Sequence, residues 1–172
     1  MMTATGDEHN VARVVPHPKY NRRTLDYDYA ILELSNDIPL TATSKARAAC
    51  LPTADTDVSG ANFTVSGWGT LSYGGGSPSV LHSVTVPHVA DETCNEIYAV
   101  YGGITDRMMC AGGLAENTVD SCQGDSGGNF LTHIRPSKSN SKTCLFSGPL
   151  TWVDPNTSKV NLVGVVSWGI GN

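Results

Sequence analysis

The chain has 172 residues, enough for one domain or two small ones, and 40% of them are hydrophobic while 16% are charged. Its formal net charge of -5 is mild, and its longest basic cluster is the pair Arg22-Arg23, which argues against a nucleic-acid partner. No apolar stretch approaches the length of a membrane span, so we expect a soluble globular protein without a membrane partner. Residues 1–8 are polar and acidic, so any export signal is expected outside this chain.

The first part of the chain predicts two short strands. Residues 11–15 are mainly apolar and run into a proline-rich turn. Residues 30–34 form a second apolar run, introduced by the acidic and aromatic residues 26–29. Residues 35–49 are polar and read as a linker.

The rest of the chain predicts three further strands, at residues 63–69, 80–89 and 162–168. Between them, residues 91–101 favour a short helix with Asp91 as its cap. The 18 glycines lie in short clusters between the apolar runs, which is typical of strands joined by tight turns. We therefore predict an all-β fold with one helix.

The cysteines indicate disulfide chemistry. Five is an odd number, so at least one cysteine lacks a partner within these residues. None forms a Cys-x-x-Cys pair or lies near a histidine at metal-ligand spacing, so we expect no metal site. Disulfides in an oxidising compartment are the better interpretation for Cys50, Cys94, Cys110, Cys122 and Cys144.

Residues 120–128, with the sequence DSCQGDSGG, are the segment that carries the strongest chemical signal. A serine hydroxyl is a poor nucleophile that needs a base, exposure and donors for the oxyanion that forms. The neighbouring glycines allow a sharp turn that exposes Ser126, and the N–H groups of Gly124 and Ser126 can converge as an oxyanion hole. A glycine-rich surface loop is the alternative interpretation of such a segment.

The whole nine-residue string resembles the active-site signature of the trypsin and chymotrypsin family of serine proteases. Other segments match that family in the order of its chain, so the resemblance spans nearly all 172 residues. It implies two antiparallel β-barrels with the active site between them. Residues 1–45 would supply the end of the first barrel, and residues 46–172 a linker and most of the second.

The resemblance also assigns catalytic roles. It implies that Ser126 is the nucleophile and that Asp28, just before an apolar strand, orients the catalytic histidine, while Asp26 is a surface acid. Asp120 would form an anionic floor of the specificity pocket and direct cleavage to Lys or Arg. The resemblance further implies a disulfide between Cys94 and Cys110. It places substrate contacts at Ser121, Gln123, Ser167, Trp168 and Gly169.

The chain departs from the family in several places. The segment that holds the catalytic histidine is missing, and His9 and His17 stand at the wrong chain position to replace it. The activated amino terminus that would pair with Asp125 is also missing, so we expect a zymogen-like site. Relatives continue beyond residue 172 with a further cysteine, strand and helix, so we expect a domain truncated at both ends. A calcium loop would not fit, and no cofactor is expected. Residues 132–160 read as a polar insertion, and Cys50, Cys122 and Cys144 have no expected partner.

The resemblance thus implies an extracellular serine endopeptidase that cuts polypeptides after Lys or Arg and that binds protein inhibitors. As given, the 172-residue chain is expected to be inactive. A non-catalytic homologue with a binding or regulatory role is the alternative, although such proteins usually lose the serine or the aspartate. Both Ser126 and Asp28 are present here.

Overall fold

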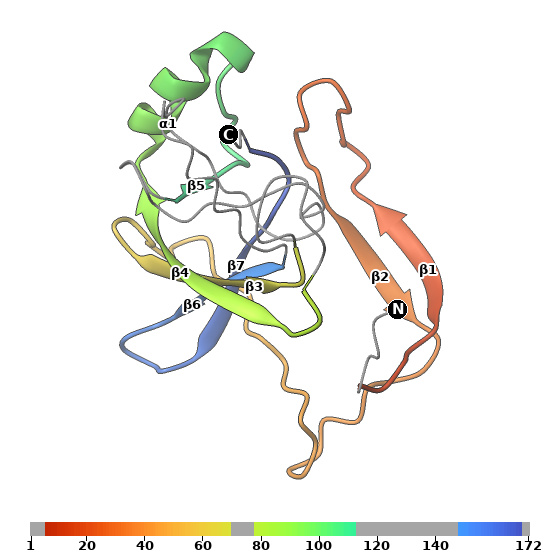
Figure 1. Ribbon diagram of the computed structural model, residues 1–172. Coiled ribbons are helices and arrows are strands. Elements are labelled where there is room, and N and C mark those ends of the chain that lie inside the picture. Colours follow the sequence, from red (N-terminus) through yellow and green to blue (C-terminus); the bar gives the residue numbers. More distant parts are fainter. Residues whose placement is uncertain (1–5, 70–77, 113–147, 170–172) are drawn as a thin grey trace.

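The computed structural model describes residues 6–69, 78–112 and 148–169. Within them the chain forms two antiparallel sheets (Figure 1). One sheet is the hairpin of β1 (Val11–Pro16) and β2 (Ala30–Leu34). The other has the strand order β5-β4-β3-β6-β7. Its members are β3 (Asn62–Gly67), β4 (His82–Val89), β5 (Cys110–Ala111), β6 (Pro149–Val153) and β7 (Val160–Val165).

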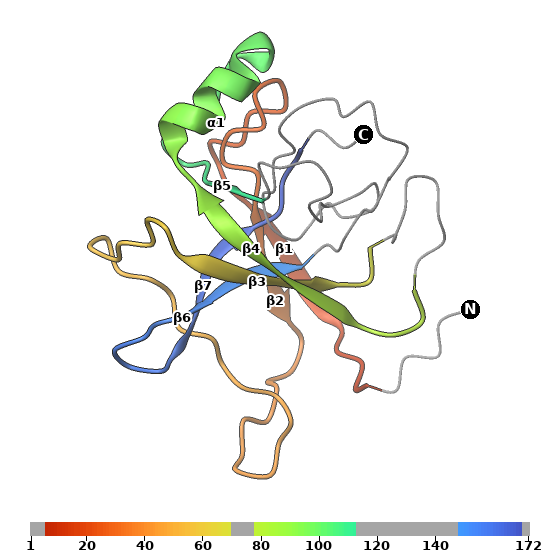
Figure 2. The ribbon, with the colours of Figure 1, turned by 60° about the vertical axis from the view of Figure 1, so that its left-hand side comes forward.

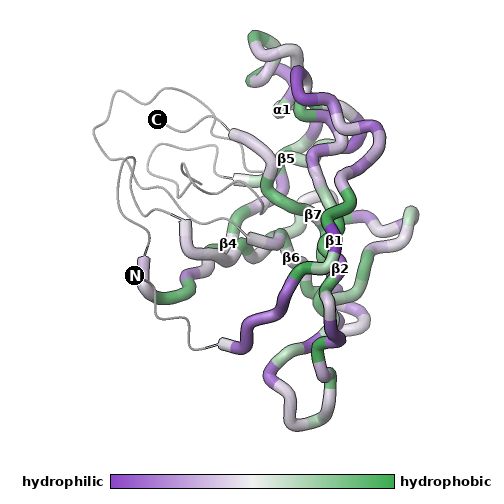
Figure 3. The backbone as a smooth tube through the Cα atoms, turned by 90° about the vertical axis from the view of Figure 1, so that its right-hand side faces the viewer, coloured by the Kyte–Doolittle hydropathy of each residue, from purple (hydrophilic) through white to green (hydrophobic). Residues whose placement is uncertain are grey.

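The hairpin stands beside the larger sheet, as the two views in Figures 1 and 2 show. Its strands have almost the bounds that the sequence predicts, and Val14 pairs with Leu32 in their register. Many of its apolar side chains are exposed, with Ile31 at 65% and Leu32 at 56%. Figure 3 shows green, apolar stretches along these strands. Because a two-stranded ribbon is marginal alone, the hairpin depends on its contacts with the larger sheet.

The core lies on one face of the five-stranded sheet. Along β3 the residues alternate, with Phe63 and Val65 fully buried and Asn62 and Thr64 exposed. This period of two is what a strand with one covered face requires. The cluster is completed by Val86, Ala111 and Leu150.

Strand β6 is a departure from the sequence prediction. It lies within residues 132–160, which were expected to be a polar insertion, yet it pairs with both β3 and β7. Its Leu150 is 1% exposed and fills the core. The last strand also differs, because β7 ends at Val165 and residues 166–169 follow it as irregular backbone. The end of the expected insertion is therefore part of the five-stranded sheet.

The helix forms where it was predicted, but its cap is different. Helix α1 (Asp91–Tyr98) is followed by the short 3-10 helix η1 (Ala99–Tyr101). The N-cap is Ala90, which makes no side-chain capping bond, so the prediction of Asp91 as cap was wrong. Asp91 instead occupies the first turn, where a negative charge is favourable to the helix dipole. The all-β prediction with one helix is confirmed, and no helix among the described residues has the length and apolarity to cross a membrane.

Candidate active site

Asp28 leaves a tight turn just before β2. The turn is closed by the N–H of Asn21, which donates to the carbonyl oxygen of Asp26 at 3.0 Å. Leu25 and Tyr27 both have φ of 55°, in the left-handed region that residues other than glycine seldom adopt. The half-buried carboxylate of Asp28 is thus presented at the entrance to a strand, as the sequence predicts.

Asp28 accepts a hydrogen bond from the hydroxyl of Ser167, with 2.6 Å between Oγ and Oδ2. This is the length of a strong bond from a hydroxyl to a carboxylate. Ser167 follows β7 and the buried Val166, so its position is fixed by the larger sheet. The bond joins two residues 139 positions apart and ties the hairpin to that sheet. The sequence placed Ser167 among the substrate contacts, and no local pattern indicated its contact with Asp28.

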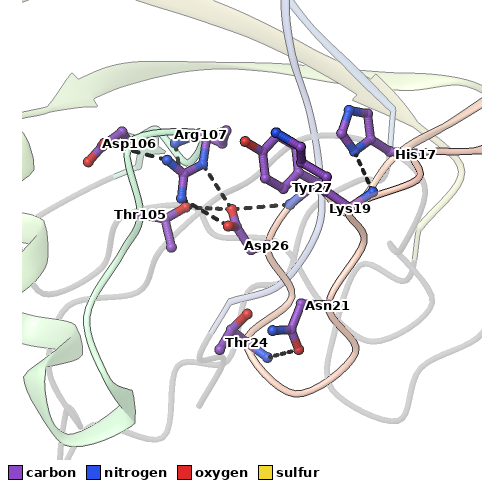
Figure 4. A network of polar contacts seen from close by, with 9 residues as sticks. All are labelled: His17, Lys19, Asn21, Thr24, Asp26, Tyr27, Thr105, Asp106 and Arg107. Carbon is purple, nitrogen blue, oxygen red and sulfur yellow. Dashed lines mark hydrogen bonds and ion pairs between the residues drawn. The ribbon is translucent and has the colours of Figure 1, made fainter.

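A second link between the sheets lies at Asp26. Its carboxylate accepts hydrogen bonds from Thr105 Oγ1 at 2.8 Å and from Arg107 Nε at 3.2 Å and Nη2 at 2.9 Å (Figure 4). These bonds, first those from Arg107 and then that from Thr105, hold the pKa of Asp26 below its usual value. The side chain of Asp26 is only 15% exposed, so the expectation of a surface acid was wrong.

Tyr27 lies between cationic and aromatic groups. The His17 ring stacks on it in parallel, with centroids 4.4 Å apart, and the Arg107 guanidinium carbon lies 5.1 Å from its centroid. His17 Nδ1 also accepts the N–H of Lys19 at 3.2 Å (Figure 4). These contacts brace the turn on the hairpin side of Asp28. They also give His17 a packing role.

The predicted disulfide between Cys94 and Cys110 is present, and it joins α1 to β5. Both cysteines are fully buried and share a cluster with Tyr98. Trp168 packs against this cluster, edge-on to the Tyr98 ring with centroids 4.8 Å apart. Trp168 is thereby held next to Ser167, with the exposed Gly169 after it. The residues predicted to contact substrate from this segment are therefore adjacent to the Asp28–Ser167 pair.

A cavity of about 300 Å³ lies between the hairpin and the larger sheet. Asp28 and Ser167 line it, together with apolar side chains such as Met109, Leu150 and Leu162. The acid and the hydroxyl therefore face a mainly apolar space, where a hydrogen bond to a carboxylate counts for more than in water. Within the described part of the chain, no group of three histidine, cysteine or acidic residues is placed to hold a metal ion.

The other predicted site residues lie outside the described residues. They are Asp120, Ser121, Gln123, Gly124 and Ser126, together with Asp125, Cys122 and Cys144. The described residues therefore supply Asp28 with its partner Ser167, the segment around Trp168, and the disulfide between Cys94 and Cys110.

Comparison with known proteins agrees with the motifs. The sequence profile of the trypsin family, described as Trypsin, matches residues 2–172. Trypsin 5G1 of Aedes aegypti is 41% identical over 162 residues, which is 94% of this chain and 50% of that protein. Trypsin Blo t 3 of Blomia tropicalis is 37% identical over 163 residues, covering 93% and 51%. Serine proteinase stubble of Drosophila melanogaster is 38% identical over 167 residues, covering 95% and 18%.

The described residues form an all-β fold in which the Ser167 hydroxyl holds the Asp28 carboxylate between the two sheets. The match over nearly the whole chain settles the assignment: this chain belongs to the trypsin family of serine proteases. It has that family's all-β architecture. The chain spans about half the length of the two trypsins that it matches.

Proposed function

We propose that this chain supplies the nucleophile and the orienting acid of a secreted serine endopeptidase that cuts after Lys or Arg. Residues 1–45 would be the end of a first barrel, and residues 46–172 a linker and most of a second. The observation that supports this best is the 2.6 Å bond between Ser167 and Asp28. It holds a half-buried carboxylate in one orientation at the junction of the two sheets, which is what an acid that orients a histidine requires.

The reaction would proceed through an acyl-enzyme. The Ser126 hydroxyl attacks the carbonyl carbon of the scissile bond while a histidine takes its proton, and Asp28 holds that histidine in the reactive tautomer. The N–H groups of Gly124 and Ser126 stabilise the oxyanion that forms. The histidine returns the proton to the leaving amine, and water then releases the acyl group by the same steps.

Specificity would come from Asp120. A carboxylate at the floor of the pocket pairs with the side chain of Lys or Arg, while Ser121 and Gln123 line the pocket nearby. Trp168 and Gly169 would border the substrate, since Trp168 is fixed against Tyr98 and Gly169 adds no side chain. The expected partners are polypeptide substrates and protein inhibitors. The buried disulfide between Cys94 and Cys110 supports an extracellular location.

The 172-residue chain alone would not turn over substrate, because neither of the two histidines that precede Asp28 is placed to act as its base. His17 stacks on Tyr27 and accepts the Lys19 N–H. His9 lies in the exposed segment before β1. A base supplied by a longer product of the same gene would complete the site.

The test compares two proteins on peptide substrates that differ only in Arg, Lys or Phe before the cut. One is the 172-residue chain. The other is the chain extended by the residues that precede it in its transcript or, where the transcript encodes none, by the corresponding part of trypsin 5G1. We expect turnover only from the extended protein, with Arg and Lys preferred, and its loss in Ser126→Ala and Asp28→Asn. Asp37→Asn, at an exposed acid outside the site, is the matched control.

The outcomes separate the claims. An extended protein that folds and forms the disulfide but cleaves nothing would instead be a non-catalytic homologue. Cleavage that persists in Ser126→Ala would refute the assignment of Ser126 as the nucleophile. Equal rates on Arg and Phe substrates, or unchanged rates in Asp120→Ser, would remove the specificity proposal alone.

A further inference from the structure

Two segments of the chain match the acceptor sequence for N-linked glycosylation, Asn-x-Ser/Thr. One begins at Asn62 and the other at Asn156. The structure places them in very different surroundings. We propose that Asn156, and not Asn62, carries an N-linked oligosaccharide.

Asn156 lies at the tip of the hairpin that joins β6 to β7. Residues 155–159 are all exposed, and the turn is held by Asp154. Its carboxylate accepts the N–H of Asn156 at 2.9 Å and the hydroxyl of Thr157 at 2.6 Å. Its carbonyl oxygen accepts the N–H of Ser158 at 2.8 Å. The acceptor triplet is therefore ordered by its own turn, with no side chain in the core, and an attached sugar displaces no packing.

The triplet at Asn62 lies in the sheet. Phe63, its middle residue, is fully buried in the core. Thr64, its third residue, pairs with Thr85 on one side and Thr151 on the other. A transferase that must grip all three residues could reach this triplet only before the sheet forms, whereas the triplet at Asn156 stays accessible throughout folding.

The chemistry is a group transfer from an oligosaccharide carried on a lipid pyrophosphate. The Asn156 side-chain nitrogen forms a bond to the anomeric carbon of the first sugar. The bond from that carbon to the pyrophosphate oxygen breaks, the lipid pyrophosphate leaves, and the amide loses one proton to a base. Ser158 supplies the hydroxyl that defines the acceptor triplet. The buried disulfide between Cys94 and Cys110 is the observation that supports the compartment in which this transfer occurs.

The sugar would lie away from the candidate active site. The whole of β7 separates the hairpin tip from Ser167, and at about 3.3 Å per residue this is on the order of 20 Å. β7 is also the outermost strand of the described five-stranded sheet. The start of its outer edge is already paired with Cys50, whose N–H donates to the carbonyl oxygen of Val160 at 2.9 Å. A sugar at Asn156 would therefore leave the candidate active site uncovered. Its attachment requires only entry into the secretory pathway, whether or not the protein is catalytic.

The experiment expresses the 172-residue chain behind a cleavable export signal in insect cells. Peptide mapping after enzymatic deglycosylation in heavy-oxygen water marks each occupied asparagine. Mapping both the secreted and the cell-retained chain keeps the test decisive for variants that fold poorly. We expect Asn156 to be occupied, and the sugar to be lost in Asn156→Gln and Ser158→Ala.

Two matched variants should keep the sugar. Thr157→Ala removes the hydroxyl bonded to Asp154 but leaves the acceptor triplet intact, and Asn62→Gln removes only the other triplet. Asn156 found unoccupied in a chain that entered the secretory pathway would overturn the proposal. Occupancy of Asn62 in the unaltered chain would overturn the discrimination between the two sites.

Discussion

Replacing Ser167 by alanine should loosen the β1–β2 hairpin while leaving the five-stranded sheet in place. Ser167 belongs to the larger sheet's side of the site, and its hydroxyl donates to Asp28 at 2.6 Å on the hairpin's side. A hydrogen bond to a charged acceptor contributes about 1.5–3 kcal/mol. Since each 1.4 kcal/mol is about a factor of ten, opening of the hairpin should become about tenfold to about a hundredfold more frequent.

Amide hydrogen exchange followed by mass spectrometry measures this opening directly. Peptides that cover β1 and β2 should exchange faster by that factor in Ser167→Ala, whereas peptides that cover β3 and β4 should keep their rates. Ser83→Ala is the matched control, because Ser83 is exposed on β4. Two results would refute the idea that the Ser167–Asp28 bond couples the two sheets. One is exchange rates in the hairpin within twofold of those in the unaltered protein, and the other is an equal rise of the exchange rates in both sheets.

Two further predictions rest on other contacts. Gly148→Ala should lower the free energy of unfolding by about 1–3 kcal/mol, because the added Cβ would lie 1.4 Å from the Ser66 carbonyl oxygen. Urea titration measures this loss, and Gly6→Ala, where the added Cβ meets open space, is the control. A Gly148→Ala protein as stable as Gly6→Ala would contradict the reasoning. For Asp26, bonds from its arginine and threonine partners lower the pKa from the usual 3.8, so the stability it contributes is complete above about pH 4 and is lost as pH falls through the lowered value. Asp26→Asn should therefore be less stable at neutral pH and lose less stability on acidification, measured by thermal unfolding from pH 7 to pH 3; a pH dependence like that of the unaltered protein would contradict the assignment.

The sequence predicts the strands whose pattern is local. The hairpin strands have the expected bounds because apolar runs are punctuated by prolines on one side and by acidic and aromatic residues on the other. Strand β6 was missed because it begins at Pro149 and follows a long polar stretch, although Leu150 and Trp152 are its apolar signal. Its strand character comes from pairing with β3 and β7, which a local pattern does not contain.

The site shows the same division. The motif around residue 126 and the acid at Asp28 are visible because short strings carry them. The partners of the two acids are not visible in the sequence, because Ser167 is 139 positions from Asp28 and Arg107 is 81 positions from Asp26. Only the folded chain brings these residues together. The same holds for the burial of Asp26, whose sequence neighbours are those of a surface turn.

The most direct test of the protease assignment is covalent labelling of the extended protein with an arginine-containing phosphonate ester. Such a reagent phosphonylates a serine that is activated by a base and stands beside a pocket for a basic side chain. The account predicts one label, mapped by peptide mass to Ser126, which forms much more slowly with a phenylalanine analogue and is abolished in Asp28→Asn. A folded, disulfide-bonded protein labelled at another residue, or not at all, would contradict it.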